Sequence, residues 1–473
     1  MNASGPDTPQ RLEAMLAAQR GALVEKGPLS VERRAEALSG LAEAVIRHSE
    51  ALIRSISEDF GHRSPDETRL AELFPVVSAA RHARRRLRAW TRPERRPISA
   101  LFQPGRGRVV FQPLGVVGLI SPWNYPVQLT LLPLIGAIAA GNRAMIKPSE
   151  QTPRTADALA ALLAEVFPSD EVLVVQGGPD VARAFSRLRF DHLLFTGSTS
   201  IGRDVMRAAA EGLVPVTLEL GGKTPAIVAP DYPLAKAAER IALGKLFNAG
   251  QTCIAPDFVL VDARREAAFL DAIAGAASRL YPAYGANADY TAIISDRHRR
   301  RLVDMVEDAE RRGATVRRLG SPSEDLSGTG KLAPVLLSGV PEDAAVLREE
   351  IFGPLLPVVP YDTLEEAYAF LARRPPPLAL YLFSHDNATV ARTLERTRSG
   401  GVTVNDTLLH CVQEELPFGG VGESGMGAYH GEAGFRTFSH ARSVFHQSRI
   451  NGAGLTRPPY GNRIERLLGW FLR

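Results

Sequence analysis

The chain has 473 residues, of which 45% are hydrophobic and 23% are charged, a composition typical of soluble globular proteins. Its 56 basic and 52 acidic residues leave a formal net charge of +4, an excess too small for this length to indicate a nucleic-acid-binding protein. The length predicts two or three domains.

The cysteine content and the chain ends bear on the cellular compartment. Cys253 and Cys411 are the only cysteines, and no run of 18 or more residues is apolar throughout. The N-terminal sequence lacks the basic start and the apolar stretch of a secretory signal. Two cysteines provide no disulfide framework, which suits a reducing compartment. We therefore expect a cytoplasmic protein without a membrane-spanning helix.

Helical patterns dominate the first part of the chain, and an α/β alternation follows them. Residues 9–60 and 65–90 are rich in alanine, leucine, arginine and glutamate, and an arm containing proline and glycine follows at 92–107. Short apolar runs then alternate with helix-length segments, which predicts βαβ units and a parallel sheet covered on both faces. The predicted strands are 115–120, 143–147, 171–175 and 192–196, and the predicted helices are 127–141, 153–167, 179–187 and 200–211.

The pattern restarts in the second half as another α/β layer rather than as a repeat of the first. Residues 215–220 and 225–230 are strand-like. Helices are expected at 234–247, 265–279 and 296–312, with a surface loop at 321–331.

The sequence contains two arginine-rich stretches whose roles it does not decide. Residues 81–97 lack the interleaved aromatic residues of RNA binders, so an exposed helix face followed by an exposed arm is favoured over a polyanion site. At the C-terminus, Ile464, Leu467, Leu468 and Phe471 fall at helical spacing among arginines. Such a tail could lie on a membrane surface, but packing on its own body or on a partner subunit is favoured.

The stretch FTGSTSIG, residues 195–202, is a candidate phosphate-binding turn. A predicted strand runs into Gly197 and Ser198, and a helix is expected to open near Gly202. Glycines allow the backbone to approach a phosphate, and a helix N-terminus offers free N–H groups. Alone this is a weak signal, because strand–glycine–helix turns are common in α/β folds.

The stretch IKPSEQTP, residues 146–153, places charges where dinucleotide folds contact an adenosine ribose. A predicted strand ends at Lys147, and Glu150 follows. A capped helix start after Pro148 explains the same residues equally well.

Three further loops carry polar groups next to prolines or glycines. SPWNYP, residues 121–126, holds Asn124 between two prolines, a rigid setting that suits an amide stabilising an oxyanion. Glu219 ends a strand before two glycines, and Glu350 and Phe352 precede another glycine turn. Taken singly, Asn124 could be structural and either glutamate could be a surface charge.

Cys253 lies in FNAGQTCIAPDF, residues 247–258, a loop marked by glycine and by small polar residues. A free cysteine often packs as a small hydrophobe. A thiol in such a loop is also placed where a ligand could approach. The surrounding candidate residues favour a nucleophile over a packing role.

The order of these stretches is more specific than any one of them. The chain resembles the aldehyde dehydrogenase superfamily over residues 10–450, most closely its class 3 branch and the bacterial coniferyl aldehyde dehydrogenases. The stretches that carry the resemblance are SPWNYP, IKPSEQTP, FTGSTSIG, LELGGK, GQTC, EEIFGP and LPFGGVGESGMGAYHG.

The resemblance implies a role for each catalytic candidate. Cys253 resembles the nucleophile, Asn124 and the Cys253 backbone N–H the oxyanion hole, and Glu219 the base that activates the deacylating water. Thiolate attack would form a thiohemiacetal, hydride loss a thioester, and hydrolysis the acid. Cys411 lies in the segment that lines the family's substrate tunnel, so it either touches substrate or packs.

The resemblance also implies NAD or NADP as cofactor. Glu350 resembles the group that holds the nicotinamide ribose, with Phe352 beside the ring. The other implied cofactor contacts are Lys147 and Glu150 at the adenosine ribose, Gly197, Ser198 and Gly202 at the pyrophosphate, and Trp123.

The predicted surroundings of Cys253 raise a difficulty for a thiolate. The residue follows the end of a predicted helix, where the dipole disfavours negative charge, and no lysine, arginine or histidine lies within four residues. We hypothesise that the positive charge of the oxidised nicotinamide lowers the pKa of the thiol.

The expected substrate is an aromatic, coniferyl-type aldehyde or a medium- or long-chain aliphatic one. The alternatives are a reductive semialdehyde or acyl-phosphate enzyme of the same fold, a cysteine-dependent esterase, and a non-catalytic protein. The intact set of Cys253, Asn124 and Glu219 argues against the last.

We expect an α/β fold with three parts and, from the resemblance, a homodimer without a metal. The three parts are a Rossmann-like dinucleotide-binding domain (1–91 and 113–222), a second α/β catalytic domain (223–403) and a small β oligomerisation element (92–112 and 404–445), and a C-terminal tail (446–473) follows them.

Overall fold

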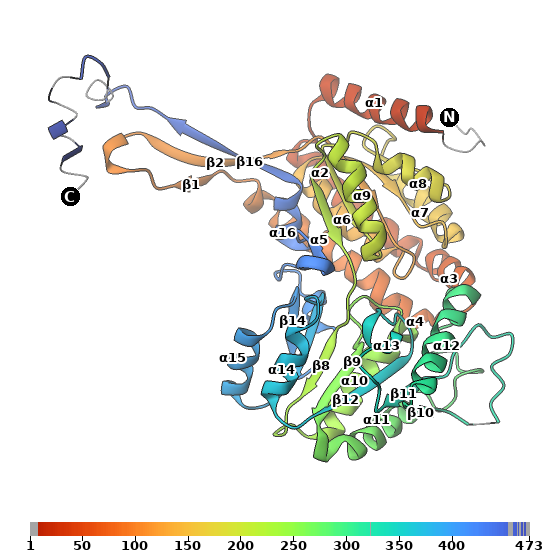
Figure 1. Ribbon diagram of the computed structural model, residues 1–473. Coiled ribbons are helices and arrows are strands. Elements are labelled where there is room, and N and C mark those ends of the chain that lie inside the picture. Colours follow the sequence, from red (N-terminus) through yellow and green to blue (C-terminus); the bar gives the residue numbers. More distant parts are fainter. Residues whose placement is uncertain are drawn as a thin grey trace.

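Three sheets organise the chain, two inside the body and one in a projecting arm (Figure 1). The computed structural model describes residues 8–321, 323–452, 457–460, 462, 465–466 and 468–469. Within this part of the chain, no helix is both long enough and apolar enough to cross a bilayer. Of the amphipathic tail expected at the C-terminus, Ile464, Leu467 and Phe471 lie outside the described residues.

The first sheet has six strands in the order β15-β7-β6-β3-β4-β5 and is parallel except for β15. Alternate residues of β3 pack into two separate cores, Val117 and Leu119 into one and Val116 and Ile120 into the other. This burial on both faces explains its continuous apolar sequence. The strands are β3(Val116–Ile120), β4(Arg143–Lys147), β5(Val172–Val174), β6(His192–Thr196), β7(Val216–Glu219) and β15(Gly425–Met426).

Helices cover both faces of this sheet (Figure 1). The helices α1(Pro9–Lys26), α8(Pro179–Ser186) and α9(Thr199–Glu211) contribute to one core. The other core receives α2(Val31–Arg47), α3(Ser49–Phe60), α5(Phe74–Trp90), α6(Gln128–Ala140), α7(Pro153–Val166) and α16(Gly431–Thr437).

The second sheet has seven strands in the order β10-β11-β12-β9-β8-β13-β14 and is parallel except for the β10–β11 pair. Its strands are β8(Pro225–Val228), β9(Phe258–Asp262), β10(Thr315–Arg318), β11(Val335–Ser338), β12(Leu355–Tyr361), β13(Ala379–Phe383) and β14(Gly401–Val404). Its helices are α10(Leu234–Leu246), α11(Glu266–Leu280), α12(Asp296–Arg311), α13(Ala345–Arg348), α14(Leu364–Ala372) and α15(Asn387–Arg396).

The third sheet is antiparallel and forms the arm seen at the upper left of Figure 1. It consists of β1(Glu94–Arg96), β2(Arg106–Pro113) and β16(Ser439–His446). Residues 404–445 divide between sheets, because β15 pairs with β7 of the first sheet while β16 pairs with β2 in the arm. Short helical turns complete the fold: η2(Ala100–Phe102), η3(Phe247–Gly250), η4(Ala263–Arg265), η5(Leu409–Val412) and η6(Gly422–Ser424).

The expected first-sheet strands and helices agree with the observed ones to within one or two residues at most ends. The helical pattern expected at 65–90 is confirmed, and in the structure it is divided into α4(Pro65–Thr68), a π-helical turn η1(Arg69–Leu73) and α5. The helix expected at 200–211 begins at Thr199, three residues before Gly202, because the Ser198 side chain caps it by accepting from the Ile201 N–H.

The connection between the two sheets determines where a site can form. β7 ends at Glu219 and β8 begins at Pro225, so only residues 220–224 lead from the carboxyl edge of the first sheet to the amino edge of the second. Loops that follow strands of the first sheet therefore face loops that precede strands of the second. In open α/β sheets, ligands bind at such carboxyl edges.

Candidate active site

The loop after β3 presents Asn124 at the carboxyl edge of the first sheet. Asn124 is 3% exposed, and its Nδ2 donates to the Gln251 carbonyl at 3.2 Å. Its own carbonyl accepts hydrogen bonds from Arg63 Nη1 at 3.1 Å and Asn248 Nδ2 at 3.2 Å. The predicted oxyanion-hole amide thus directly contacts the loop that carries Cys253.

That second loop follows α10 and has an unusual backbone. Asn248 and Ala249 have positive φ values of 52° and 50°, a conformation that non-glycine residues rarely adopt. The Gln251 side chain holds the loop by donating to the Asn248 and Ala292 carbonyls, both at 3.0 Å, and by accepting from the Ile294 N–H at 3.0 Å. Cys253 follows and is partly exposed.

The surroundings of the Cys253 thiol disfavour its charged form. Burial raises the pKa of this thiol, and the nearby Glu350, Cys411 and Glu219 raise it further. The structure therefore brings the predicted nucleophile and the two predicted glutamates together. These surroundings favour the neutral thiol over the thiolate.

Glu219 ends β7 and is 2% exposed. Neither carboxylate oxygen has a hydrogen-bond partner among the described residues. Burial raises the pKa of this carboxyl well above its usual value. A buried carboxyl without partners is costly, and its position beside a thiol is typical of a group that exchanges protons.

Glu350 lies in the loop before β12, and burial raises the pKa of its carboxyl to about 8. Its Oε1 has no partner among the described residues, so a ribose hydroxyl would satisfy a buried acceptor. Lys223 holds the loop by donating to the Val346 and Glu349 carbonyls at 2.8 and 2.9 Å. The Asp257 carboxylate accepts from the Ile351 N–H at 3.1 Å.

Aromatic rings lie beside this loop. Phe352 has a positive φ of 52°, and its ring centroid is 5.3 Å from that of Trp123. Trp123 also contacts His298, at 5.1 Å between centroids, and Phe60, at 6.1 Å. Trp123 and Phe352, both predicted from their motifs, therefore lie next to each other.

The remaining predicted cofactor residues follow β4 and β6, which are separated in the first sheet only by β3. Lys147 is 1% exposed, and its Nζ donates to the Pro148 carbonyl at 2.7 Å and lies 3.9 Å from Glu150 Oε2. Burial lowers the pKa of Lys147. A helix does start after Pro148, since α7 begins at Pro153, but its N-cap residue Thr152 makes no side-chain cap hydrogen bond.

The turn after β6 also has the predicted form. Gly197 follows the strand, and Ser198 caps α9. Gly202 lies inside α9, where a β-carbon would approach Leu220 Cδ2 to 2.7 Å. The role of Gly202 in the structure is therefore close packing of helix against connector, while the free N–H groups of the first turn of α9 remain available to a phosphate.

Comparison with known proteins decides the family. The family model described as the aldehyde dehydrogenase family matches residues 6–444. The chain belongs to the aldehyde dehydrogenase family. It is 51% identical over 458 residues to a probable coniferyl aldehyde dehydrogenase of Pseudomonas aeruginosa, covering 97% of this chain and 95% of that protein.

Two further similarities support the same assignment. The rat (Rattus norvegicus) aldehyde dehydrogenase family 3 member A2 is 44% identical over 360 residues, 76% of this chain and 72% of that protein. The solved structure described as the substrate-bound state of Staphylococcus aureus AldH covers 100% of both chains with a TM-score of 0.91 and 36% identity. The expected aldehyde dehydrogenase fold is confirmed, and this aldehyde dehydrogenase is an NAD(P)-dependent enzyme.

Four charged residues buried near the site of this aldehyde dehydrogenase were missed by sequence reasoning: Arg63, Glu67, Glu72 and Lys245. The first three lie at or near the start of the helical pattern at 65–90, which gives no sign that their charges are buried. Lys245 ends α10, and its Nζ has no hydrogen-bond partner among the described residues. Burial lowers the pKa of Lys245 to about 8, and the charges of Asp257 and Glu350 partly oppose this.

Cys411 packs against the main core and is close enough to Cys253 to influence its pKa. Burial raises the pKa of Cys411 to about 12. The Phe418 ring stacks on two histidines, 6.0 Å from His410 and 5.2 Å from His430. Cys411 is also close enough to Tyr381 and Tyr429 to influence their pKa values.

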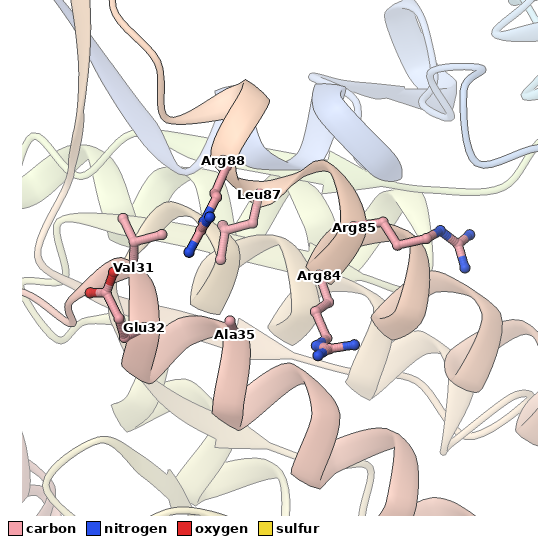
Figure 2. Close-up of a pocket in the computed structure, with 7 residues that line it drawn as sticks. All are labelled: Val31, Glu32, Ala35, Arg84, Arg85, Leu87 and Arg88. Atoms are coloured by element: carbon pink, nitrogen blue, oxygen red, sulfur yellow. The ribbon is translucent and has the colours of Figure 1, made fainter.

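A surface hollow of about 270 Å³ lies between α2 and α5 (Figure 2). None of the predicted site residues lines it. Its arginines are exposed, which confirms the exposed helix face expected at the start of 81–97. Its lining residues are Val31, Glu32, Ala35, Arg84, Arg85, Leu87 and Arg88.

Proposed function

We propose that this enzyme oxidises a coniferyl-type aromatic aldehyde to the carboxylic acid through a thioester on Cys253. The family assignment supports aldehyde oxidation, and the relative 51% identical over nearly the whole chain supports the substrate class. The observation that carries the mechanism is Glu219, a buried carboxyl that has no hydrogen-bond partner among the described residues and lies close enough to the Cys253 thiol to influence its pKa.

Each of the three candidate catalytic residues has its own step in the proposed reaction. The Cys253 thiolate attacks the aldehyde carbonyl, and the Asn124 amide and the Cys253 backbone N–H stabilise the oxyanion that develops. When bound, the nicotinamide of NAD or NADP supplies the hydride acceptor. In its ionised form, Glu219 then takes a proton from the water that releases the acid from Cys253, and a raised pKa makes this carboxylate a stronger base.

The cofactor-binding residues are assigned from their motifs and from their positions in the structure. We infer that Glu350 accepts from a nicotinamide-ribose hydroxyl, with Trp123 and Phe352 beside the ring. Lys147 and Glu150 are assigned to the adenosine ribose, where Glu150, with 42% of its side chain exposed, favours NAD and Lys147 permits NADP. Gly197, Ser198 and Gly202 are assigned to the pyrophosphate turn.

A substrate panel tests the proposal. The kcat/KM should be highest for hydroxylated aromatic propenals and lower for medium- and long-chain aliphatic aldehydes, and Cys253→Ala should abolish turnover. A preference for aliphatic aldehydes would overturn the substrate class. Acyl-phosphate or semialdehyde reduction faster than oxidation would overturn the direction, and ester hydrolysis without nicotinamide exceeding aldehyde turnover would overturn the reaction type.

We propose that the three-stranded arm joins two copies into a homodimer. Along β16, the residues Ala441, Arg442, Ser443, Phe445 and His446 are exposed, and Phe445 is 50% exposed. A projecting sheet with an open edge strand is a template for pairing with another chain. Sedimentation analysis should show a dimer that Phe445→Glu weakens; a monomer at every concentration would overturn it.

A further inference from the structure

A buried ion pair lies directly under the two loops of the active site. Arg63 Nη1 is 2.9 Å from Glu72 Oε1, and both side chains are 0% exposed. Replacing a buried ion pair by apolar residues is often neutral or stabilising, so such a pair is weak evidence for a role in stability alone. Its partners indicate what else it does.

The pair holds the loop that carries Asn124 at two points, its middle and its end. Arg63 donates to the Asn124 carbonyl at 3.1 Å, and its guanidinium lies 4.8 Å from the centroid of the Tyr125 ring. Glu72 Oε2 accepts from the backbone N–H groups of Val127 and Gln128 at 2.9 and 2.7 Å. The orientation of the Asn124 peptide therefore depends on this pair.

Glu67, from the same short segment, holds the other loop. Its two oxygens accept from the Asn248 N–H at 3.1 and 3.2 Å, and Oε2 also accepts from Thr291 Oγ1 at 2.7 Å. Asn248 is a residue with positive φ five positions before Cys253. The carboxylate thus fixes a strained backbone on which the thiol position depends.

The two loops are also joined to each other beneath the site. Asn248 Nδ2 donates to both the Asn124 and the Gln251 carbonyls, at 3.2 and 3.1 Å. Tyr125 and Thr252 share a hydrogen bond of 2.6 Å. A shift of Glu67 or of the Arg63–Glu72 pair would therefore change the position of the Asn124 amide relative to the Cys253 thiol.

A local irregularity lets one segment reach both loops. Residues 69–73 form a π-helical turn, and such turns are frequent at functional sites. Glu67 and Glu72 are five residues apart, which would place them on different faces of a regular α-helix. Both are buried here, 7% and 0% exposed.

We propose that Arg63, Glu67 and Glu72 are positioning residues that hold the Asn124 amide and the Cys253 thiol at the relative position needed for attack on the aldehyde. The proposal rests on the roles assigned above to Asn124 and Cys253. None of the three is expected to touch substrate; they act through backbone groups of the two loops.

The first experiment compares Glu67→Gln with Asp66→Asn, which makes the same charge change on an exposed neighbour in the same helical turn. All donors to Glu67 point at its oxygens, so an amide N–H₂ in their place breaks at least one contact. Glu67→Gln should lower kcat about 10- to 100-fold with KM for aldehyde and NAD nearly unchanged. Asp66→Asn should behave as the wild type. Unchanged kcat in a folded Glu67→Gln would overturn the proposal.

The second experiment separates positioning from stability. Glu72→Gln alone leaves a buried guanidinium without its ion pair and can unfold the protein. The double variant Arg63→Met with Glu72→Leu removes both charges together. It should retain cooperative thermal unfolding, at a temperature lowered by the loss of the acceptor for the Val127 and Gln128 N–H groups, while kcat falls about 10-fold or more. A stable double variant with wild-type kcat would overturn the proposal.

A double-mutant cycle links the effect to the oxyanion hole. If Glu67 acts by holding Asn124 and Cys253 at the correct relative position, Glu67→Gln should lower kcat by a much smaller factor in an Asn124→Ala background than in the wild type. Equal losses in both backgrounds would contradict the proposal. The rate of Cys253 alkylation in Glu67→Gln, measured without cofactor or aldehyde, should also change. Wild-type activity on the substrate panel tests the proposed function separately, so failure of one is distinguishable from failure of the other.

Discussion

The carboxylate of Glu350 occupies the space that a side chain on Gly221 would fill. Gly221 lies in the connector between the two sheets, and the neighbouring Gly222 backbone makes a hydrogen bond to Glu350 that lowers its pKa. The loop before β12 and the connector after β7 therefore interlock at this point. The position of the group assigned to the nicotinamide ribose depends on the absence of a β-carbon at 221.

Gly221→Ala should displace Glu350 without unfolding the protein, because the clash is with the far end of a flexible side chain. We expect the Kd for NAD to rise about 10-fold, measured by titration calorimetry, with little change in thermal unfolding. Gly178→Ala is the matched control, since a β-carbon there meets nothing within 4 Å. Equal NAD affinity in both variants would contradict the assignment of Glu350.

Asn124→Ala tests the oxyanion hole. If the amide stabilises charge that develops only in the transition state, kcat should fall about 100-fold or more while binding of aldehyde and cofactor changes little. Steady-state kinetics over a range of both substrates provides the measurement. A loss confined to KM would mean that Asn124 only orients the substrate.

Glu219→Gln should block deacylation and leave the earlier steps intact. We expect a pre-steady-state burst of reduced cofactor approaching one per active site, followed by slow turnover, with an acyl group on Cys253 detectable by mass spectrometry. Cys253→Ser should show no comparable burst. Loss of both burst and turnover in folded, cofactor-binding Glu219→Gln would indicate that Glu219 acts earlier, by deprotonating the thiol.

Glu150→Gln should shift cofactor preference toward NADP. The carboxylate is expected to accept from the ribose 2′-hydroxyl and to repel a 2′-phosphate, which the neighbouring Lys147 partly offsets. The ratio of kcat/KM for NAD to that for NADP measures the shift. An unchanged ratio would remove Glu150 from the adenosine-ribose site.

The raised pKa of Cys253 has a direct consequence for its reactivity with pH. Because only the thiolate reacts, alkylation of the free enzyme should still be accelerating above pH 9, the usual pKa of a cysteine thiol. Oxidised NAD should move this profile to lower pH, since its positive charge favours the thiolate. Identical profiles with and without NAD would contradict that hypothesis. Cys253→Ala identifies any contribution from Cys411.

The sequence by itself determined the strands of the first sheet and the loops that carry the candidate chemistry. β3, β4 and β6 are short apolar runs that are buried on both faces of the sheet. A continuous apolar run can be recognised from the local sequence, without knowledge of the neighbouring strands. Cys253 and Asn124 lie in loops with glycine or proline after a helix and a strand, and Glu219 ends a strand before two glycines, so these side chains are set apart from packing residues. Their motifs therefore predicted the candidate site before the fold was known.

Only the tertiary structure decided how Arg63, Glu67 and Glu72 are used. Arg63 lies between the helical patterns at 9–60 and 65–90, Glu67 and Glu72 lie within the second, and neither pattern marks these charges as buried. The partners that bury them lie far along the chain, 61 residues away for Arg63 with Asn124 and 181 for Glu67 with Asn248. Those partners are largely backbone groups, which are the same in every residue and leave no side-chain pattern. Local periodicity reports which face of an element is apolar, whereas the burial of a charge depends on the distant loops folded over it.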